Sequence, residues 1–252
     1  MNHIQLFSYP TSPYAQKVGC YLDYKGLEFN LVGVNPMTND QIKFTRQRQV
    51  PVLQIGDQWR KGSSEIGLWL EQLYPEKPIL PAAPSERDRI LQIDKWISDS
   101  LIPSVFRSAV EWQSSVDSIT NGWKLSRAVN NATPLPMFVR LIWPFAVKRA
   151  PFIVNMVKQL DLTESMDEML LRLQGEFVEQ LQGGVFLGAR SEPSMADLSA
   201  FPVVVNAYMM GMRAKRFILD RPEINAWAKQ VSSYLPENPL LVDDKFLQRR
   251  LA

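Results

Sequence analysis

Residues 4–26 read IQLFSYPTSPYAQKVGCYLDYKG, and this stretch predicts a strand followed closely by a helix. Residues Ile4 to Tyr9 form a short apolar strand that a proline ends. Ser12-Pro13 then places a capping hydroxyl directly before a proline at the first helical position, and Gly26 marks the end of the helix. The chain is therefore expected to begin with a strand, a tight turn and a helix.

The following residues continue this mixed pattern of strands and helices. We expect a strand over residues 27–34, followed by a helix that begins at a capping box of Thr38 and Gln41 and runs to Arg48. Residues 50–55 and 58–60 should form a hairpin around Gly56-Asp57. A third helix should follow, capped by Ser63 or Ser64 and ending near Tyr74-Pro75. The first part of the chain therefore predicts a small α/β domain.

A proline-rich stretch separates this part from the rest, with Pro75, Pro78, Pro81 and Pro84 at every third position. Such spacing excludes a continuous helix and indicates a linker. Ser85 and Asp88 offer the next capping signal, and from Arg89 to Leu251 the periodicity is helical with no convincing strand. We predict an α/β domain over residues 1–76, a linker over 77–84 and an all-α domain over 85–252.

The composition limits the possible chemistry. The chain has 252 residues, a formal net charge of +2, one Cys and one His. One Cys and one His cannot assemble a metal site or a dithiol, and the near-neutral charge gives no reason to expect nucleic acid as a partner. No secretory signal precedes the first strand, so a cytoplasmic protein is expected.

One apolar stretch raises the question of a membrane. Residues 138–157 are apolar, but Arg140, Lys148 and Arg149 interrupt them too often for a span of a bilayer. We therefore expect no transmembrane segment. A helix pair with a solvated basic edge is the first interpretation, and weak peripheral contact with a membrane surface is the alternative.

Four local motifs follow one another along the chain. They are Thr11-Ser12-Pro13-Tyr14-Ala15-Gln16-Lys17-Val18, Val50-Pro51, Gly62-Ser63-Ser64-Glu65-Ile66, and Phe186-Leu187-Gly188 before Pro193-Ser194-Met195-Ala196-Asp197. Together they resemble motifs of the glutathione transferase superfamily. The resemblance implies a thioredoxin-like α/β N-terminal domain, an all-α C-terminal domain, glutathione as co-substrate without a metal, and a homodimer. It also implies a cis-proline at Pro51 that presents the backbone of Val50 to glutathione.

A closer likeness within the superfamily rests on Tyr9-Pro10-Thr11-Ser12-Pro13, Val34-Asn35-Pro36, Ile42-Lys43-Phe44, Val50-Pro51, Trp96 and residues 102–107. In these stretches the chain looks like the prostaglandin E synthase type 2 group. The group has Cys-Pro-x-Cys in the first motif, whereas this chain has Ser12 and Ala15 in place of both thiols. An isomerase without its thiols is therefore only an alternative function.

The resemblance implies a site on the N-terminal domain. Ser12 at a helix N-terminus would favour the thiolate of glutathione, although its hydroxyl is also a candidate helix cap. Tyr9 is the alternative donor to the sulfur. Ser63 and Ser64 would bind the γ-glutamyl carboxylate at another helix N-terminus. Gly62 stands where relatives carry an acid for the ligand's amino group, and Glu65 or a second subunit would have to replace that acid.

The remaining predictions concern the helical domain and its border with the N-terminal domain. A hydrophobic electrophile would bind between the domains, near Tyr14, Phe106 and Trp112. Ser194 and Asp197 form a capping box with a structural role. The sequence thus predicts a protein that binds reduced glutathione and transfers it to a hydrophobic electrophile. The alternative outside enzymology is a binding or regulatory module that kept the fold and lost the ligand.

Overall fold

A computed structural model of the chain describes residues 3–9, 11–35, 37–111, 115–133, 136–138, 141–142, 151–213 and 218–251. Four strands form one sheet in its N-terminal half: β1 (Ile4–Ser8), β2 (Asn30–Gly33), β3 (Val52–Ile55) and β4 (Gln58–Lys61). Their order is β2-β1-β3-β4, with β1 and β2 parallel and the other two pairs antiparallel. The hairpin between β3 and β4 turns at Gly56, whose φ of 58° is one that glycine adopts easily.

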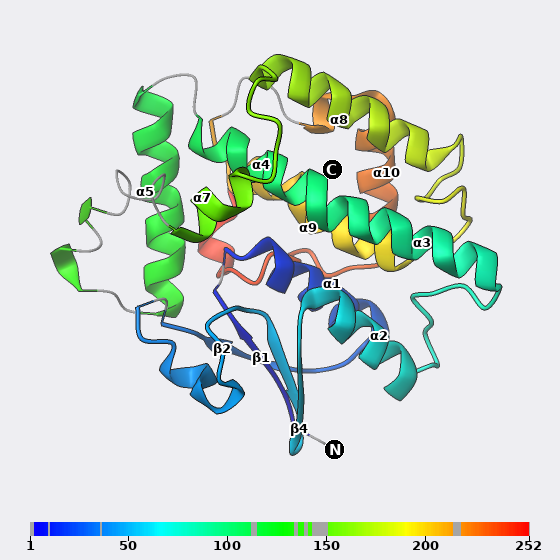
Figure 1. Cartoon of the computed structure of the whole chain (residues 1–252), viewed down its shortest axis with the longest axis horizontal. Helices are drawn as coiled ribbons and strands as arrows, with labels where there is room; N and C mark the ends of the chain where they lie inside the picture. Colours follow the sequence, from blue (N-terminus) through cyan, green and yellow to red (C-terminus); the bar gives the residue numbers. More distant parts are fainter. Residues whose placement is uncertain are drawn as a thin grey trace.

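Alternating side chains give the sheet two buried faces. Helices α1 (Pro13–Lys25) and α2 (Ser63–Leu73) lie on one face of the sheet, as Figure 1 shows. Ile4 and Leu6 of β1 belong to the same apolar cluster as residues of these two helices. Phe7 points to the opposite face and packs in a small cluster with Val34, Ile42 and Val52. Helix α1 begins at Pro13 and ends before Gly26, whose φ is 73°, as the sequence predicts.

Three predictions of helix and strand limits are wrong. The segment predicted as a helix toward Arg48 is a short 3₁₀ helix, η1 (Asp40–Thr45). The expected capping box does not form, because the Thr38 hydroxyl donates to Asp40 and the Gln41 side chain accepts from the Asn35 N–H. Strand β2 is also shorter than predicted and begins at Asn30. The first helix after the linker begins at Pro84 with Ala83 as its N-cap, so Ser85 does not cap it.

Helices make up the rest of the described chain. They are α3 (Pro84–Trp96), α4 (Ile102–Val110), α5 (Ser115–Ala132), α7 (Pro151–Val157), α8 (Met166–Leu181), α9 (Met195–Met209) and α10 (Pro222–Ser232). One π-helical turn, η2 (Ile97–Leu101), joins α3 to α4. In this part of the described chain, β pairing is limited to one isolated bridge between Phe186 and Arg190. None of the described helices is both long and apolar enough to cross a membrane.

Helix α9 is the centre of the core. It is buried on nearly all sides and packs against α1, α3 and α10 (Figure 1). One continuous apolar cluster includes Leu6 of the sheet, Tyr21 of α1, Phe201 of α9 and Trp227 of α10. The cluster therefore crosses the predicted linker, and the predicted domain limits at residues 76 and 85 stay predictions.

The C-terminal segment folds back onto the N-terminal half. The Gln16 side-chain amide donates to the Leu240 carbonyl at 2.8 Å, and a Cβ added to Gly19 would lie 2.8 Å from Leu241. Gly19 thus allows the segment to approach α1 closely. We call residues 239–248 the C-terminal tail; apart from η5 (Asp244–Phe246) they form no helix.

Candidate functional site

Three segments of the N-terminal half meet at one edge of the sheet, because the strand register fixes where each strand ends. Phe7 of β1 pairs with Val52, the first residue of β3, and Val52 pairs with Lys61, the last residue of β4. The start of α1, the segment before β3 and the start of α2 therefore lie at the same edge. This edge carries Ser12, Val50 and Ser63.

The Ser12 hydroxyl is not used to cap α1. Ser12 is the N-cap residue, and its carbonyl accepts from the backbone N–H groups of Ala15 and Gln16 at 3.1 and 3.0 Å. Its side chain makes no cap hydrogen bond. The capping alternative is therefore not realised, and a half-buried hydroxyl stands at the positive end of the α1 dipole.

Tyr9 has another partner. Its hydroxyl donates to Asn39 Oδ1 at 2.7 Å and lies 3.4 Å from the Arg48 carbonyl. Burial raises the pKa of Tyr9, which disfavours the phenolate. The hydroxyl thus ties the end of β1 to the segment around η1.

The segment before β3 leaves backbone groups available. The Val50–Pro51 peptide bond is cis. Among the described residues, no hydrogen-bond partner is found for the backbone N–H or carbonyl of Val50. This is the backbone that the resemblance implies for contact with a peptide-like ligand.

The start of α2 differs from the prediction. Gly62, with a φ of 77°, is the N-cap, and neither serine caps the helix. Ser63 occupies the first helical position and is buried. Ser64 points elsewhere: its hydroxyl donates to Asp94 Oδ2 at 2.6 Å and accepts from Lys17 Nζ at 3.1 Å. Of the two serines, only Ser63 has a hydroxyl without such a partner.

Glu65 lies beside the position of the missing acid. A Cβ added to Gly62 would lie 3.8 Å from Glu65 Oε2 and 3.7 Å from its carboxyl carbon. Glu65 is exposed and sits in the first turn of α2. A carboxylate is therefore present next to Gly62, supplied from three residues further along the chain.

Sequence reasoning missed a buried ion pair behind this edge. Lys17 Nζ lies 2.7 Å from Asp94 Oδ1, and their side chains are 0% and 3% exposed. The Ser98 and Ser64 hydroxyls accept from the same ammonium, at 3.0 and 3.1 Å, and Ser199 donates to Asp94 at 2.5 Å. Burial is the main cause that lowers the pKa of Lys17, and Asp94 opposes it. The sequence signal was a lysine on the buried face of α1.

The predicted electrophile pocket is only partly described. The Tyr14 hydroxyl donates to the Ser98 carbonyl at 2.9 Å. Burial, with a smaller contribution from Asp99, raises the pKa of Tyr14 to about 12, so this phenol stays protonated. Phe106 of α4 is half-buried and packs on the same apolar cluster as Tyr14. Trp112 lies outside the described residues.

Ser194 and Asp197 make the structural contacts expected of them. Asp197 is fully buried and accepts from the Ser194 N–H, the Leu187 N–H and Trp227 Nε1, each at 2.8 Å. Burial raises its pKa despite these bonds. The carboxylate therefore ties the start of α9 to α10 and to the preceding loop. Within the described ranges, no cluster of three or more His, Cys, Asp or Glu side chains could hold a metal ion.

Comparison with known proteins agrees with this geometry. Residues 6–78 match the family described as glutathione S-transferase, N-terminal domain. Prostaglandin E synthase 2 of Danio rerio is 22% identical over 272 residues, which cover 89% of this chain and 69% of that protein.

Solved structures share the whole fold. The β-etherase LigF of Sphingobium sp. strain SYK-6 aligns with a TM-score of 0.61 at 20% identity, covering 94% of this chain and 96% of that one. A maleylacetoacetate isomerase of Anaeromyxobacter dehalogenans, with dicarboxyethyl glutathione and citrate in its active site, aligns with a TM-score of 0.54 at 18% identity, covering 93% and 91%.

The matched residues contain the last three residues of β1, the other three strands, α1 and α2. The helices that follow continue the fold of those structures. The chain has a thioredoxin-like α/β part and a helical remainder. Residues 6–78 are similar to the N-terminal domain of glutathione S-transferases, and the chain as a whole is similar in sequence to prostaglandin E synthase 2.

Proposed function

We propose that this chain binds reduced glutathione at the edge formed by Ser12, Val50 and Ser63, and transfers it to a hydrophobic electrophile. The observation that carries the proposal is the Ser12 hydroxyl, which makes no cap bond although it stands at the N-terminus of α1. A free hydroxyl donor and the positive end of a helix dipole both favour an anionic sulfur. A fold neighbour with a glutathione derivative in its active site supports the choice of ligand.

Each part of the tripeptide has a partner in this proposal. The free backbone groups of Val50 pair with the cysteinyl segment, and Pro51 sets their direction. Ser63 and the first N–H groups of α2 bind the γ-glutamyl carboxylate, because a helix N-terminus attracts anions. Glu65 accepts the ligand's amino group in place of the acid missing at Gly62.

The other parts of the proposal follow from the resemblance. Tyr14 and Phe106 are assigned to the electrophile pocket, Tyr9 is the second candidate for the donor to the sulfur, and the protein is a cytoplasmic homodimer. Tyr9 ranks below Ser12 because its hydroxyl already donates to Asn39.

Calorimetric titration with reduced glutathione tests the ligand site. We expect binding that weakens about tenfold or more in Ser63→Ala and in Glu65→Gln, because each change removes a hydrogen bond to a charged group. Matched controls are Ser233→Ala, whose hydroxyl donates only to the Gln230 carbonyl, and Glu179→Gln, exposed on α8. Both controls should bind like the wild type.

The role of Ser12 needs a separate readout. The ultraviolet absorbance of bound thiolate, followed against pH, gives the pKa of the glutathione thiol in the complex. Loss of one hydrogen bond in Ser12→Ala should raise that pKa by roughly one unit. An unchanged pKa would assign thiol activation to another group, with Tyr9→Phe as the next variant.

A specific observation favours one other function. Gly62 has no side chain where relatives carry an acid, which fits a module that kept the fold and lost the ligand. If calorimetry detects no binding of glutathione at several millimolar, the module without a ligand becomes the better explanation. An isomerase of the prostaglandin E synthase type 2 kind has less support, because Ser12 and Ala15 replace the cysteines of that group.

A further inference from the structure

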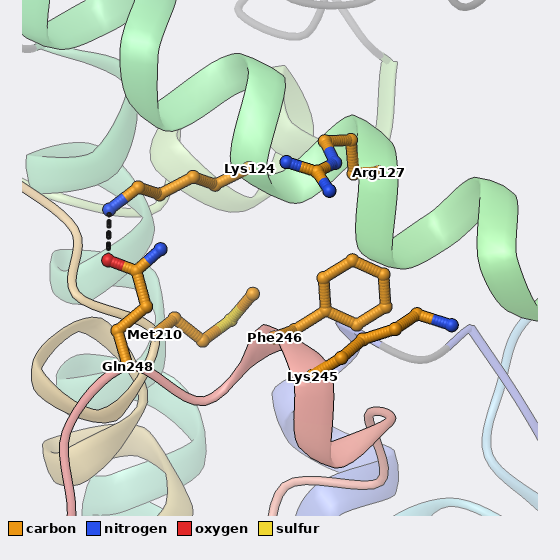
Figure 2. A pocket seen from close by; sticks show the side chains of 6 residues that line it. All are labelled: Lys124, Arg127, Met210, Lys245, Phe246 and Gln248. Atoms are coloured by element: carbon orange, nitrogen blue, oxygen red, sulfur yellow. Dashed lines mark hydrogen bonds between the residues drawn. The ribbon is translucent and has the colours of Figure 1, made fainter.

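A pocket lies between α5, the end of α9 and the C-terminal tail. Its lining consists of Lys124, Arg127, Met210, Lys245, Phe246 and Gln248 (Figure 2). Three of the six are cationic and none is acidic. None of them belongs to the edge that carries Ser12, Val50 and Ser63.

The polar groups that face this pocket are hydrogen-bond donors. Gln248 Oε1 accepts from Lys124 Nζ at 3.1 Å, which turns the amide nitrogen of Gln248 toward the pocket (Figure 2). The Arg127 guanidinium points to the same space, and no described residue forms a hydrogen bond or ion pair with it. A guanidinium offers five N–H donors and no acceptor.

The positive charge here is only partly balanced. Lys245 donates to Asn131 and to Asp243, whose Oδ2 lies 3.0 Å from its ammonium, so this cation has a counter-ion. Lys124 instead donates to two neutral oxygens, of Gly211 and Gln248. Burial lowers the pKa of Lys124, and the nearby Arg249 and Arg213 lower it further, so additional cations lie near this pocket.

The rest of the lining is apolar. In Figure 2 the Phe246 ring and the Met210 side chain lie beneath the Arg127 guanidinium and the Lys124 side chain. Such a surface suits a flat apolar group, while the donors above it suit an oxyanion. We propose that this pocket binds a small organic oxyanion carried on an aromatic ring, an aryl phosphate or aryl carboxylate, as a site separate from that of glutathione.

Titration of the whole protein with three probes tests both halves of the proposal. Phenyl phosphate carries the anion and the ring, inorganic phosphate the anion alone, and phenol the ring alone. We expect phenyl phosphate to bind most tightly and its affinity to fall as salt is raised, because salt screens exposed charges. If phenol binds as tightly as phenyl phosphate, the proposed role of the cations is contradicted.

Three variants locate the bound probe. Arg127→Gln should weaken phenyl phosphate about tenfold or more, because it removes charge-assisted bonds. Lys229→Gln, an equal loss of charge at an exposed position of α10, should change nothing. Phe246→Ala should weaken phenyl phosphate but leave inorganic phosphate unchanged, with far-ultraviolet circular dichroism checking that the variant is folded.

Three further results would overturn the proposal. The first is an absence of saturable phenyl phosphate binding up to about 10 mM, since a Kd above that corresponds to less than about 3 kcal/mol of binding free energy. The second is equal affinity in Arg127→Gln. The third is displacement of phenyl phosphate by glutathione, which would place the anion at the Ser12 edge. Undisturbed binding of both ligands together supports two separate sites.

Discussion

Removal of the negative charge from the buried pair behind α1 should destabilise the protein strongly. Asp94→Asn keeps the size of the side chain but leaves the fully buried Lys17 ammonium with neutral hydrogen-bond partners in place of its carboxylate. Breaking a buried pair by removing one partner typically costs about 3–5 kcal/mol. We expect a loss of that size in the free energy of unfolding, measured with urea by tryptophan fluorescence and circular dichroism.

Two further variants isolate the charge. In the double variant Lys17→Met, Asp94→Asn, no uncompensated charge is buried, so part of the lost stability should return. Asp40→Asn removes an exposed carboxylate paired with Lys43 and should leave the urea midpoint unchanged. A loss below about 1 kcal/mol in Asp94→Asn, or strictly additive effects of the two substitutions, would refute the argument.

The defect should also depend on pH. Burial lowers the pKa of Lys17 and the Asp94 charge raises it, so Asp94→Asn should lower the pKa of Lys17 in the folded state further. At alkaline pH the folded variant then binds fewer protons than the unfolded chain, and stability rises with pH wherever the unfolded state binds more protons. The deficit of Asp94→Asn should therefore shrink as pH increases, in urea titrations repeated across that range.

Three other substitutions should change stability in stated directions, each measured by urea unfolding. Burial raises the pKa of Asp23 from 3.8 to about 6. Between these pH values the folded state binds more protons than the unfolded chain, so stability falls as pH rises. Asp23→Asn should therefore raise the free energy of unfolding by about 1 kcal/mol at pH 7.5, after a discount for partial exposure, and should not change it below about pH 4. A gain that is equal at both pH values would contradict the titration argument. Gly33→Ala places a Cβ 2.7 Å from the Ala132 carbonyl and should cost about 1–3 kcal/mol. Gly175→Ala meets nothing within 4 Å inside α8 and should gain about 0.5–1 kcal/mol, so a loss there would contradict the open space.

Signals confined to a few neighbouring residues made the N-terminal half predictable. Ser12-Pro13 and Gly26 set the two ends of α1, and Gly56 set the hairpin. Each acts through its own backbone geometry, so no distant contact is needed. The same logic failed at Thr38 and Gln41, because both side chains found other partners in their own loop.

The candidate site was predictable only in part, because its details depend on long-range contacts. Two adjacent serines at the start of α2 have the same local sequence signal, yet Ser64 turns away toward Asp94, thirty positions later. The pairing of Lys17 with Asp94 joins α1 to α3, a contact that no local pattern encodes. The place of Glu65 beside Gly62 likewise depends on the left-handed backbone at Gly62.

The return of the C-terminal tail to α1 sets the order in which the chain can complete its fold during synthesis. Leu240 follows Gln16 by 224 positions, so the outer face of α1 leaves the ribosome long before the segment that covers it. Until then, the apolar surface around Gly19 and Cys20 stays open to other molecules. A chain that lacks the C-terminal tail therefore exposes an apolar surface that is covered when the tail is present.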